Sequence, residues 1–156
     1  MAISKDFLRD QMKKLEINYG IEKFHVTKEI FDLWLEVLAD CNEEPFKLAV
    51  DRCIKKSEFA PNIAGLMKYY REVCDEHNAF INSLTSSLTT ICSIWGEKKS
   101  PESFNALKEY MERYPASTRS IELVEFTHKA ISFRNDCSAC GRIDIPTITE
   151  YIQGKR

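Results

Sequence analysis

The sequence predicts an all-α protein, a helical bundle of about six to seven helices. Glycine and proline, which interrupt helices, account for only five residues each in a chain of 156. No stretch keeps the apolar–polar alternation of a half-buried strand. Apolar residues recur instead at helical spacing, most clearly in KEIFDLWLEVLADC. A more specific arrangement within this class is two similar three-helix units joined by a long helix.

The bulk composition is that of an ordinary globular protein, with 44% apolar and 29% charged residues. The net charge of −2 lacks the basic excess of a dedicated duplex-DNA binder and argues for protein partners. The N-terminal residues contain no apolar run typical of a signal peptide, and no stretch approaches the roughly 18 apolar residues of a membrane span. We therefore expect a cytoplasmic protein whose six cysteines are reduced thiols.

Three helices are predicted before residue 60. Ser4 is positioned to cap the first helix, and Thr27 to cap the second, which covers about residues 28–41. Pro45 suits the first turn of the third helix, which ends near Ser57. The residues expected to face inward follow the helical spacing in each: Ile3, Phe7, Leu8, Met12 and Leu15, then Ile30, Phe31, Trp34, Leu35 and Leu38, then Phe46, Leu48, Ala49, Val50, Cys53 and Ile54.

A corner is predicted in SEFAPNIAGLMKYYREV. The residue before a proline avoids helical geometry, so the third helix must end before Ala60. We expect Pro61 to open the next helix and Phe59 to turn inward at the corner. No glycine or proline follows between Gly65 and Gly96, which predicts a helix of about 30 residues. The polar run NSLTSSLTT predicts a bend or break in it near residues 83–87.

Three further helices are predicted in the second half. Ser100 and Pro101 are a start signal for a helix to about residue 114, and the next covers about residues 118–133. A loop with the sequence RNDCSACGRID then leads to a short C-terminal helix. The inward residues are Phe104, Leu107, Tyr110 and Met111, then Ile121, Leu123, Val124, Phe126, Ala130 and Ile131.

In both halves a Pro-x-Ile sequence is predicted to open the next helix, at Pro61 and Ile63 and again at Pro146 and Ile148. This similarity leaves open a structural repeat or an ordinary use of proline at helix starts. We place the predicted domains at residues 1–82 and 83–156, which could also pack as one domain.

The pair Cys137-x-x-Cys140 is half of a tetrahedral zinc site. The remaining cysteines are isolated and the three histidines form no spaced pair, so two incidental thiols in a polar loop are the simpler interpretation. Zinc with ligands from elsewhere stays an alternative. A redox pair is disfavoured because no βαβ pattern precedes it. No cofactor is expected.

Two other groups of residues have both a structural and a functional interpretation. Trp34 and Trp95, with Phe31, Phe46 and Phe59, are interpreted as core anchors. A second group is basic and forms either a small phosphate- or acid-binding patch or the solvated face of two helices: Lys47, Arg52, Lys55, Lys56, Lys68 and Arg71.

Sequence signatures of catalysis are missing. The phosphate-binding glycine loops, the HExxH zinc motif and the GxSxG nucleophile elbow do not occur. No pair of carboxylates stands in an apolar setting. We therefore expect a protein that is not an enzyme.

From about residue 19 to residue 74 the chain resembles the N-terminal domain of phage replicative-helicase loader/inhibitor proteins. The likeness lies in an amphipathic helix that contains Trp34 and in a second helix that follows it. Phe59, Pro61 and Ile63 then stand just before a third helix. The family more usually has a second proline where Ala60 stands.

The resemblance implies a non-enzymatic protein of a phage-infected bacterial host that binds a hexameric replicative helicase, holds it inactive and delivers it to an origin-bound initiator. In the family the second half is short and poorly ordered and is implicated in helicase contact. Here it is predicted to be a second helical unit. The alternatives are a phage-encoded inhibitor or regulator of another host protein, or a small nucleic-acid-binding module that uses Lys55 and Lys56.

Overall fold

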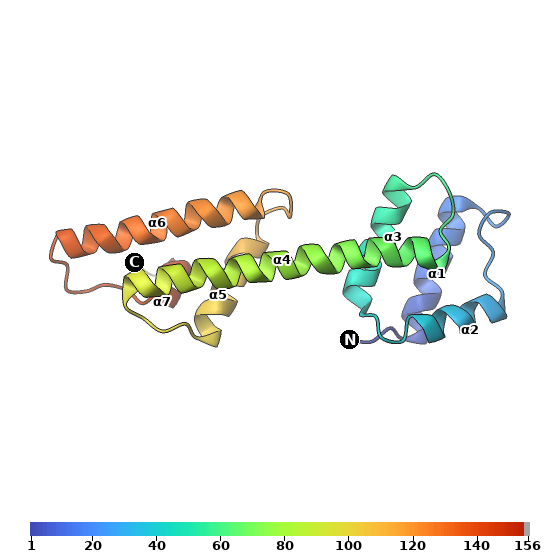
Figure 1. Ribbon diagram of the computed structural model, residues 1–156, viewed down its shortest axis with the longest axis horizontal. Helices are drawn as coiled ribbons and strands as arrows, with labels where there is room; N and C mark the ends of the chain where they lie inside the picture. The colour runs from blue at the N-terminus through green and yellow to red at the C-terminus, as the bar shows by residue number, and fades with distance from the viewer. Residues whose placement is uncertain (155–156) are drawn as a thin grey trace. The chain divides into compact units, whose positions relative to one another are not determined.

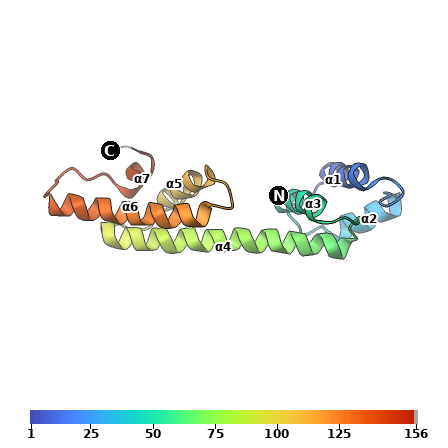
Figure 2. The same ribbon diagram turned by 90° about the horizontal axis from the view of Figure 1, so that it is seen from above.

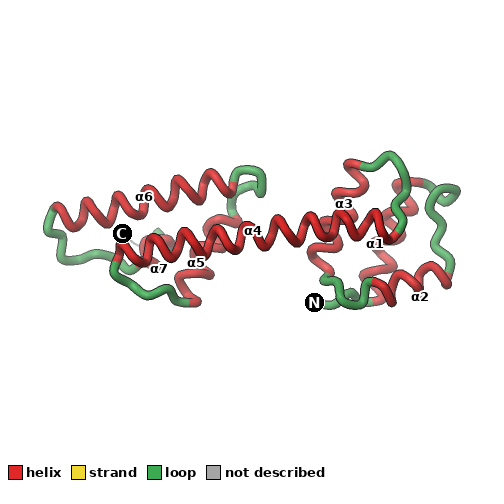
Figure 3. Tube along the Cα trace, in the orientation of Figure 1, coloured by secondary structure: helices red, strands yellow, loops and turns green. Residues whose placement is uncertain are grey.

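The protein is all-α, as predicted. The computed structural model describes residues 1–154, in which seven helices and no strand are found (Figures 1 and 3). No helix among these residues is long and apolar enough to span a membrane. The helices are α1 (Lys5–Tyr19), α2 (Lys28–Val37), α3 (Glu43–Lys56), α4 (Ile63–Trp95), α5 (Pro101–Glu112), α6 (Arg119–Ala139) and α7 (Ile148–Ile152).

The chain folds as two compact units. Unit 1 is Met1–His77, and unit 2 begins at Asn78 and is described to residue 154. Unit 1 contains α1, α2, α3 and the first part of α4, and unit 2 contains the rest of α4 with α5, α6 and α7. The domain boundary predicted from the sequence was placed after residue 82.

Hydrogen bonds of a helix cap and of a tyrosine stabilise unit 1 in addition to its hydrophobic core. The Ser4 hydroxyl accepts from the Phe7 N–H at 3.3 Å and donates to the Glu43 carboxylate at 2.9 Å, which joins the starts of α1 and α3. The Tyr19 hydroxyl donates to the carbonyl of Ser57 at 3.0 Å. The core residues are Ile3, Leu8, Met12, Leu15, Phe24, Trp34, Leu38, Cys41, Phe46, Val50, Cys53 and Leu66.

The corner between α3 and α4 differs from the prediction. Phe59 does not turn inward, since it is 79% exposed. Pro61 does not open α4 either, because Asn62 takes the capping position and its Oδ1 accepts from the Gly65 N–H at 2.7 Å. Proline fixes only its own φ angle, so Pro61 does not determine the direction of the Phe59 side chain two residues earlier. Ile63 is the first residue of α4 and packs against the core of unit 1.

Helix α4 is continuous over its 33 residues, and the predicted bend or break near residues 83–87 is wrong. Three threonines of the polar run donate their hydroxyls to the carbonyl four residues earlier. Thr85 bonds to Ile81 at 3.0 Å and Thr89 bonds to Thr85 at 2.8 Å. These side chains add hydrogen bonds to the helix and leave its backbone pairing in place.

Unit 2 has its own core, and Figures 1 and 2 both show α6 beside the part of α4 that belongs to this unit. The Trp95 indole N–H donates to the Ala130 carbonyl at 3.2 Å. Ser100 and Ser103 form a capping box at the start of α5. The core residues are Leu84, Leu88, Ile91, Cys92, Trp95, Ala106, Leu107, Met111, Leu123, Phe126, Ala130, Ile148 and Ile152.

Two predictions about unit 2 need correction. The loop predicted from residue 134 onward is helical to Ala139, because α6 continues through the first cysteine of the pair. Pro146 does not open α7, since Thr147 caps it through the Glu150 N–H at 3.2 Å and Ile148 is the first helical residue. The order of proline, cap and isoleucine is thus the same before α4 and α7.

Several residues predicted to face inward are exposed. They are Ile30 at 37%, Leu48 at 52%, Ile121 at 63% and Val124 at 53%. Ile30 lies one turn before the buried Trp34, at the edge of the buried face of α2. Leu48, Ile121 and Val124 each lie two residues from a buried residue of their helix, which places them on a different side of it.

Candidate protein-docking surface

Helix α2 is held in unit 1 by one face. Thr27 caps it by accepting from the Ile30 N–H at 3.3 Å. Trp34 is 5% exposed and meets Phe24 edge to face, with ring centroids 5.8 Å apart. Leu38 closes the same face at the end of the helix and is 1% exposed. The sequence interpretation of Trp34 as a core anchor therefore fits its position.

A second face of α2 is apolar and exposed. Ile30, Leu33 and Val37 follow the i, i+3, i+7 spacing that places side chains on one side of a helix. Leu33 is 54% exposed and Val37 is 47% exposed. We call these three residues the α2 stripe. A helix face of this kind buries apolar area when it meets another protein.

Acidic residues border the α2 stripe. Glu29, Asp32 and Glu36 are exposed and are spaced by three and four residues along the same helix. The pKa of Glu29 is lowered by a hydrogen bond from its own backbone N–H and by one from the Thr27 side chain. The stripe is thus apolar with a negatively charged border, which suits a partner surface with basic residues around an apolar centre.

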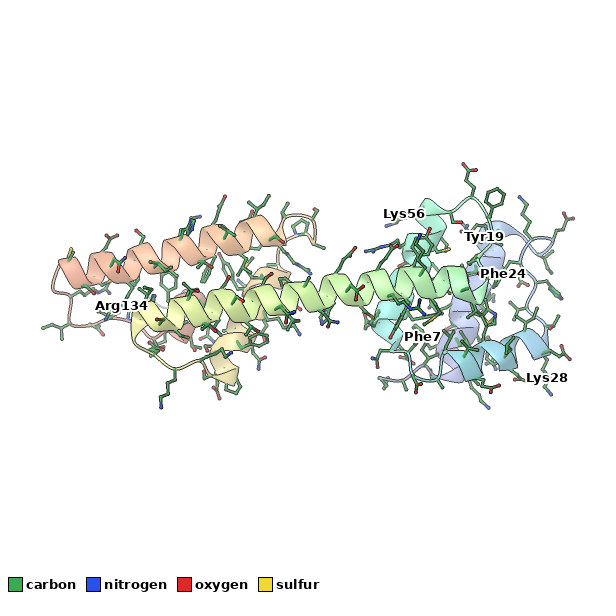
Figure 4. The ribbon with its side chains drawn as sticks, viewed as in Figure 1. Phe7, Tyr19, Phe24, Lys28, Lys56 and Arg134 are labelled. Atoms are coloured by element: carbon green, nitrogen blue, oxygen red, sulfur yellow. The ribbon has the colours of Figure 1, made fainter. Side chains whose placement is uncertain are left out.

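A groove lies on the other side of α2, between this helix and α1. Its volume is about 360 Å³. The lining combines apolar residues with three cations and one carboxylate: Arg9, Met12, Lys13, Glu16, Val26, Thr27, Lys28 and Phe31. Lys28 is the first residue of α2, and Figure 4 labels it at the N-terminal end of this helix. We call this site the α1–α2 groove.

The predicted basic patch lies on α3 and α4. Arg52 donates two hydrogen bonds to the Glu76 carboxylate, at 2.8 and 2.7 Å, and lies 3.8 Å from Glu72. The Arg52 guanidinium is therefore already bound to carboxylates of unit 1 and has little capacity left to bind a phosphate. The other members are exposed, with Lys47, Lys55 and Lys56 on α3 and Lys68 and Arg71 on α4.

The cysteine pair is not in a loop. Cys137 is a buried residue of α6, and Cys140 is exposed and follows the last residue of that helix. Among residues 1–154, no group of three or more histidine, cysteine, aspartate or glutamate side chains is arranged to hold a metal ion. The other buried thiols are poor nucleophiles, because burial raises the pKa of Cys41, Cys53 and Cys92.

The α2 stripe and the α1–α2 groove were not predicted from the sequence. One signal for the stripe was present, because Leu33 and Val37 are apolar but fall outside the inward set of their helix. The groove had no such signal. Its lining comes from two helices and a connector, and only the fold brings Arg9 and Lys13 near Lys28.

Part of the chain matches a known family. Residues 10–67 match the family model for the N-terminal domain of the phage helicase-loader/inhibitor protein gp39P. The match lies in unit 1 and includes most of α1, all of α2 and α3, and the start of α4. It confirms, for this segment, the resemblance to the N-terminal domain of phage helicase loader/inhibitor proteins. No curated protein and no solved structure matched the chain.

Proposed function

We propose that this protein is a non-enzymatic accessory protein of phage DNA replication that binds a hexameric replicative helicase in the host cytoplasm and inhibits it, loads it, or both. The observation that carries the proposal is the family match over residues 10–67. The matched segment is most of unit 1, which also carries the α2 stripe. A protein partner, rather than a small substrate, agrees with an exposed apolar helix face.

The α2 stripe is the surface on which we expect the helicase to dock. Its residues lie inside the matched segment, and none of them belongs to the core of unit 1. A few residues near the centre of an interface carry most of its binding energy. Leu33 is the most exposed of the three residues of the stripe. The acidic border formed by Glu29, Asp32 and Glu36 would steer a basic partner surface onto the stripe.

Binding is tested with the full chain and the purified replicative helicases of the phage and of its host. Size-exclusion chromatography with light scattering is run without nucleotide, with ADP and with ATP. We expect co-elution with the hexamer that depends on the nucleotide. Absence of a complex with either helicase in all three conditions contradicts the proposal. Unwinding and loading assays on the complex then separate inhibition from delivery.

The docking surface is tested with a double substitution, Leu33→Ser with Val37→Ser. We expect it to weaken helicase binding by about tenfold or more, because both side chains lose their apolar contact with the partner. The matched control is Ile121→Ser with Val124→Ser, which changes two exposed apolar residues of α6 in unit 2. Equal binding by the two double variants would exclude the α2 stripe as the docking surface while leaving the helicase partnership intact.

A further inference from the structure

We propose that the α1–α2 groove binds an acidic amphipathic segment of the partner protein. The proposal rests on the proposed function for the identity of that partner, the helicase. It adds the chemistry of the segment that is recognised: an apolar side chain to fill the groove, flanked by carboxylates.

The floor of the groove is apolar. Met12 of α1 is 1% exposed and belongs to the core of unit 1. Val26 and Phe31 are half-buried against the same core and form the remaining apolar lining. The volume of about 360 Å³ lies at the lower end of the range of small-ligand pockets, and it suits a few side chains.

The rim of the groove is basic. The Arg9 guanidinium lies 5.8 Å from the centroid of the Phe31 ring and donates to the Asp6 carboxylate at 2.9 Å. Lys13 and Lys28 are exposed, and neither makes an ion pair or side-chain hydrogen bond with another described residue. Two ammonium groups therefore remain available at the rim for carboxylates of a ligand.

The lining of the groove carries more positive than negative groups. Glu16 is the one carboxylate among the lining residues, and its Oε1 lies 3.5 Å from His25 Nδ1. Asp6 is held by Arg9. The start of α2 adds the partial positive charge of a helix N-terminus at Thr27. The groove is thus locally positive in a chain whose net charge is −2.

An acidic protein segment fits these features better than a nucleic acid. A polyanionic strand gains affinity by neutralising many phosphates, whereas the lining offers three cations. The apolar floor instead favours the binding of a peptide that carries both apolar and acidic side chains.

The first experiment tests the chemistry of the groove without the helicase. Two helical peptides, one of leucine and glutamate and one of leucine and glutamine, are titrated into the isotope-labelled full chain and followed by NMR. We expect shifts of the Lys13, Lys28 and Phe31 amides with the glutamate peptide only. Equal shifts with both peptides, or no shifts with either, overturn the proposal. Shifts at these amides with a thymidine oligonucleotide in place of the peptide also overturn it.

The second experiment uses the complex with the helicase. Lys13→Glu with Lys28→Glu is compared with Lys47→Glu with Lys55→Glu, which makes the same charge change at exposed lysines of α3. We expect the first pair to weaken binding by about tenfold and the control pair to leave it within about twofold. Circular dichroism checks that both variants keep the wild-type fold. Carbodiimide coupling, which joins an amine to a carboxylate, should link Lys13 or Lys28 to an aspartate or glutamate of the helicase.

The outcomes separate the two proposals. A helicase complex that is weakened equally by both lysine pairs, or by neither, overturns the groove proposal and leaves the proposed function standing. Wild-type protein that forms no helicase complex contradicts the proposed function, and the peptide titration then decides whether the groove still selects acidic segments.

Discussion

Arg52 joins α3 to α4 through a two-pronged contact with Glu76. The two terminal guanidinium nitrogens, Nη1 and Nη2, donate to the two carboxylate oxygens at 2.8 and 2.7 Å. The hydrogen bond from Arg52 is the main reason that the pKa of Glu76 is lowered from its ordinary value of 4.5. Because the Glu76 side chain is 66% exposed, solvent screening keeps the contribution to stability small.

We predict that Arg52→Met lowers the free energy of unfolding of unit 1 by about 0.5 kcal/mol at pH 7. Glu76 has a lower pKa in the folded than in the unfolded state, so its contribution is present above about pH 4.5 and is lost as the pH falls below that value. The difference between wild type and variant should therefore shrink at pH 3. Urea unfolding at the two pH values measures it. If the difference in unfolding free energy between wild type and variant were the same at pH 3 as at pH 7, the effect would not be electrostatic. Lys55→Met is the control variant.

Phe59 and Phe46 are both in the matched segment but have opposite environments. Phe59 is 79% exposed, whereas Phe46 is 1% exposed and lies in the core of unit 1. We predict that Phe59→Ala changes the free energy of unfolding by less than about 0.5 kcal/mol, and that Phe46→Ala lowers it by about 3–5 kcal/mol. Chemical denaturation of the two variants measures both. A large loss from Phe59→Ala would show that the corner packs inward after all.

At the scale of the element, the ends of the helices are set by local chemistry. Ser4, Thr27, Ser100 and Thr147 each accept a hydrogen bond from a backbone N–H in the first turn of their helix. At α5 the contact is reciprocal, because the Ser103 hydroxyl also accepts from the Ser100 N–H at 3.1 Å. These bonds satisfy N–H groups that have no partner within the helix.

We predict that Ser100→Ala lowers the free energy of unfolding of unit 2 by about 1 kcal/mol, because the capping box at α5 loses its acceptor. Ser120→Ala is the matched control, since Ser120 is exposed on α6 and caps no helix. Thermal and urea unfolding of the two variants are compared. Similar losses in both would contradict a specific role for the cap.

The caps at Ser4, Thr27 and Ser100 were predicted correctly from the sequence, because a cap depends on residues within four positions of one another. The starts of α4 and α7 were each placed at a proline that lies before the capping residue. The all-α class followed from the scarcity of glycine and proline. The continuity of α4 was missed because a threonine hydroxyl can either compete with the helix or bond back to it, as Thr85 does. The end of α6 was missed because polar residues around Cys137 resemble a loop.

The candidate site was harder to predict than the fold. The helicase-loader resemblance over unit 1 came from a pattern of helices and was confirmed by the family match. The α1–α2 groove depends on how α1 packs against α2, and no residue spacing along the chain encodes that. Arg52 looked like a member of a basic patch because its partner Glu76 is 24 residues away.

At the scale of the whole molecule, each unit buries its own set of residues. The core of unit 1 contains no residue beyond Leu66, and the partly buried residues packed against it extend to Tyr70. The core of unit 2 begins at Leu84, with Phe80 and Ile81 packed against it. A fragment whose last residue lies between Leu66 and Leu84 therefore keeps every core residue of unit 1.

We predict that a fragment of residues 1–82 folds by itself, because it retains the complete core of unit 1 with α1, α2 and α3. Its circular dichroism spectrum should be helical and its thermal unfolding cooperative. The full chain is the reference for the helix content. A fragment without a cooperative transition would show that unit 1 needs residues beyond 82 and would refute the predicted domain boundary.

Each of the two cores contains one of the two tryptophans of the chain. Trp34 packs on Phe24 in unit 1, and Trp95 packs on Phe133 and Tyr151 in unit 2. Indole emission therefore provides a natural optical label for each unit without any added dye. Replacing either tryptophan by phenylalanine leaves one emitter, so the fluorescence of a single-tryptophan variant reports which half of the protein responds when a partner or a denaturant is added.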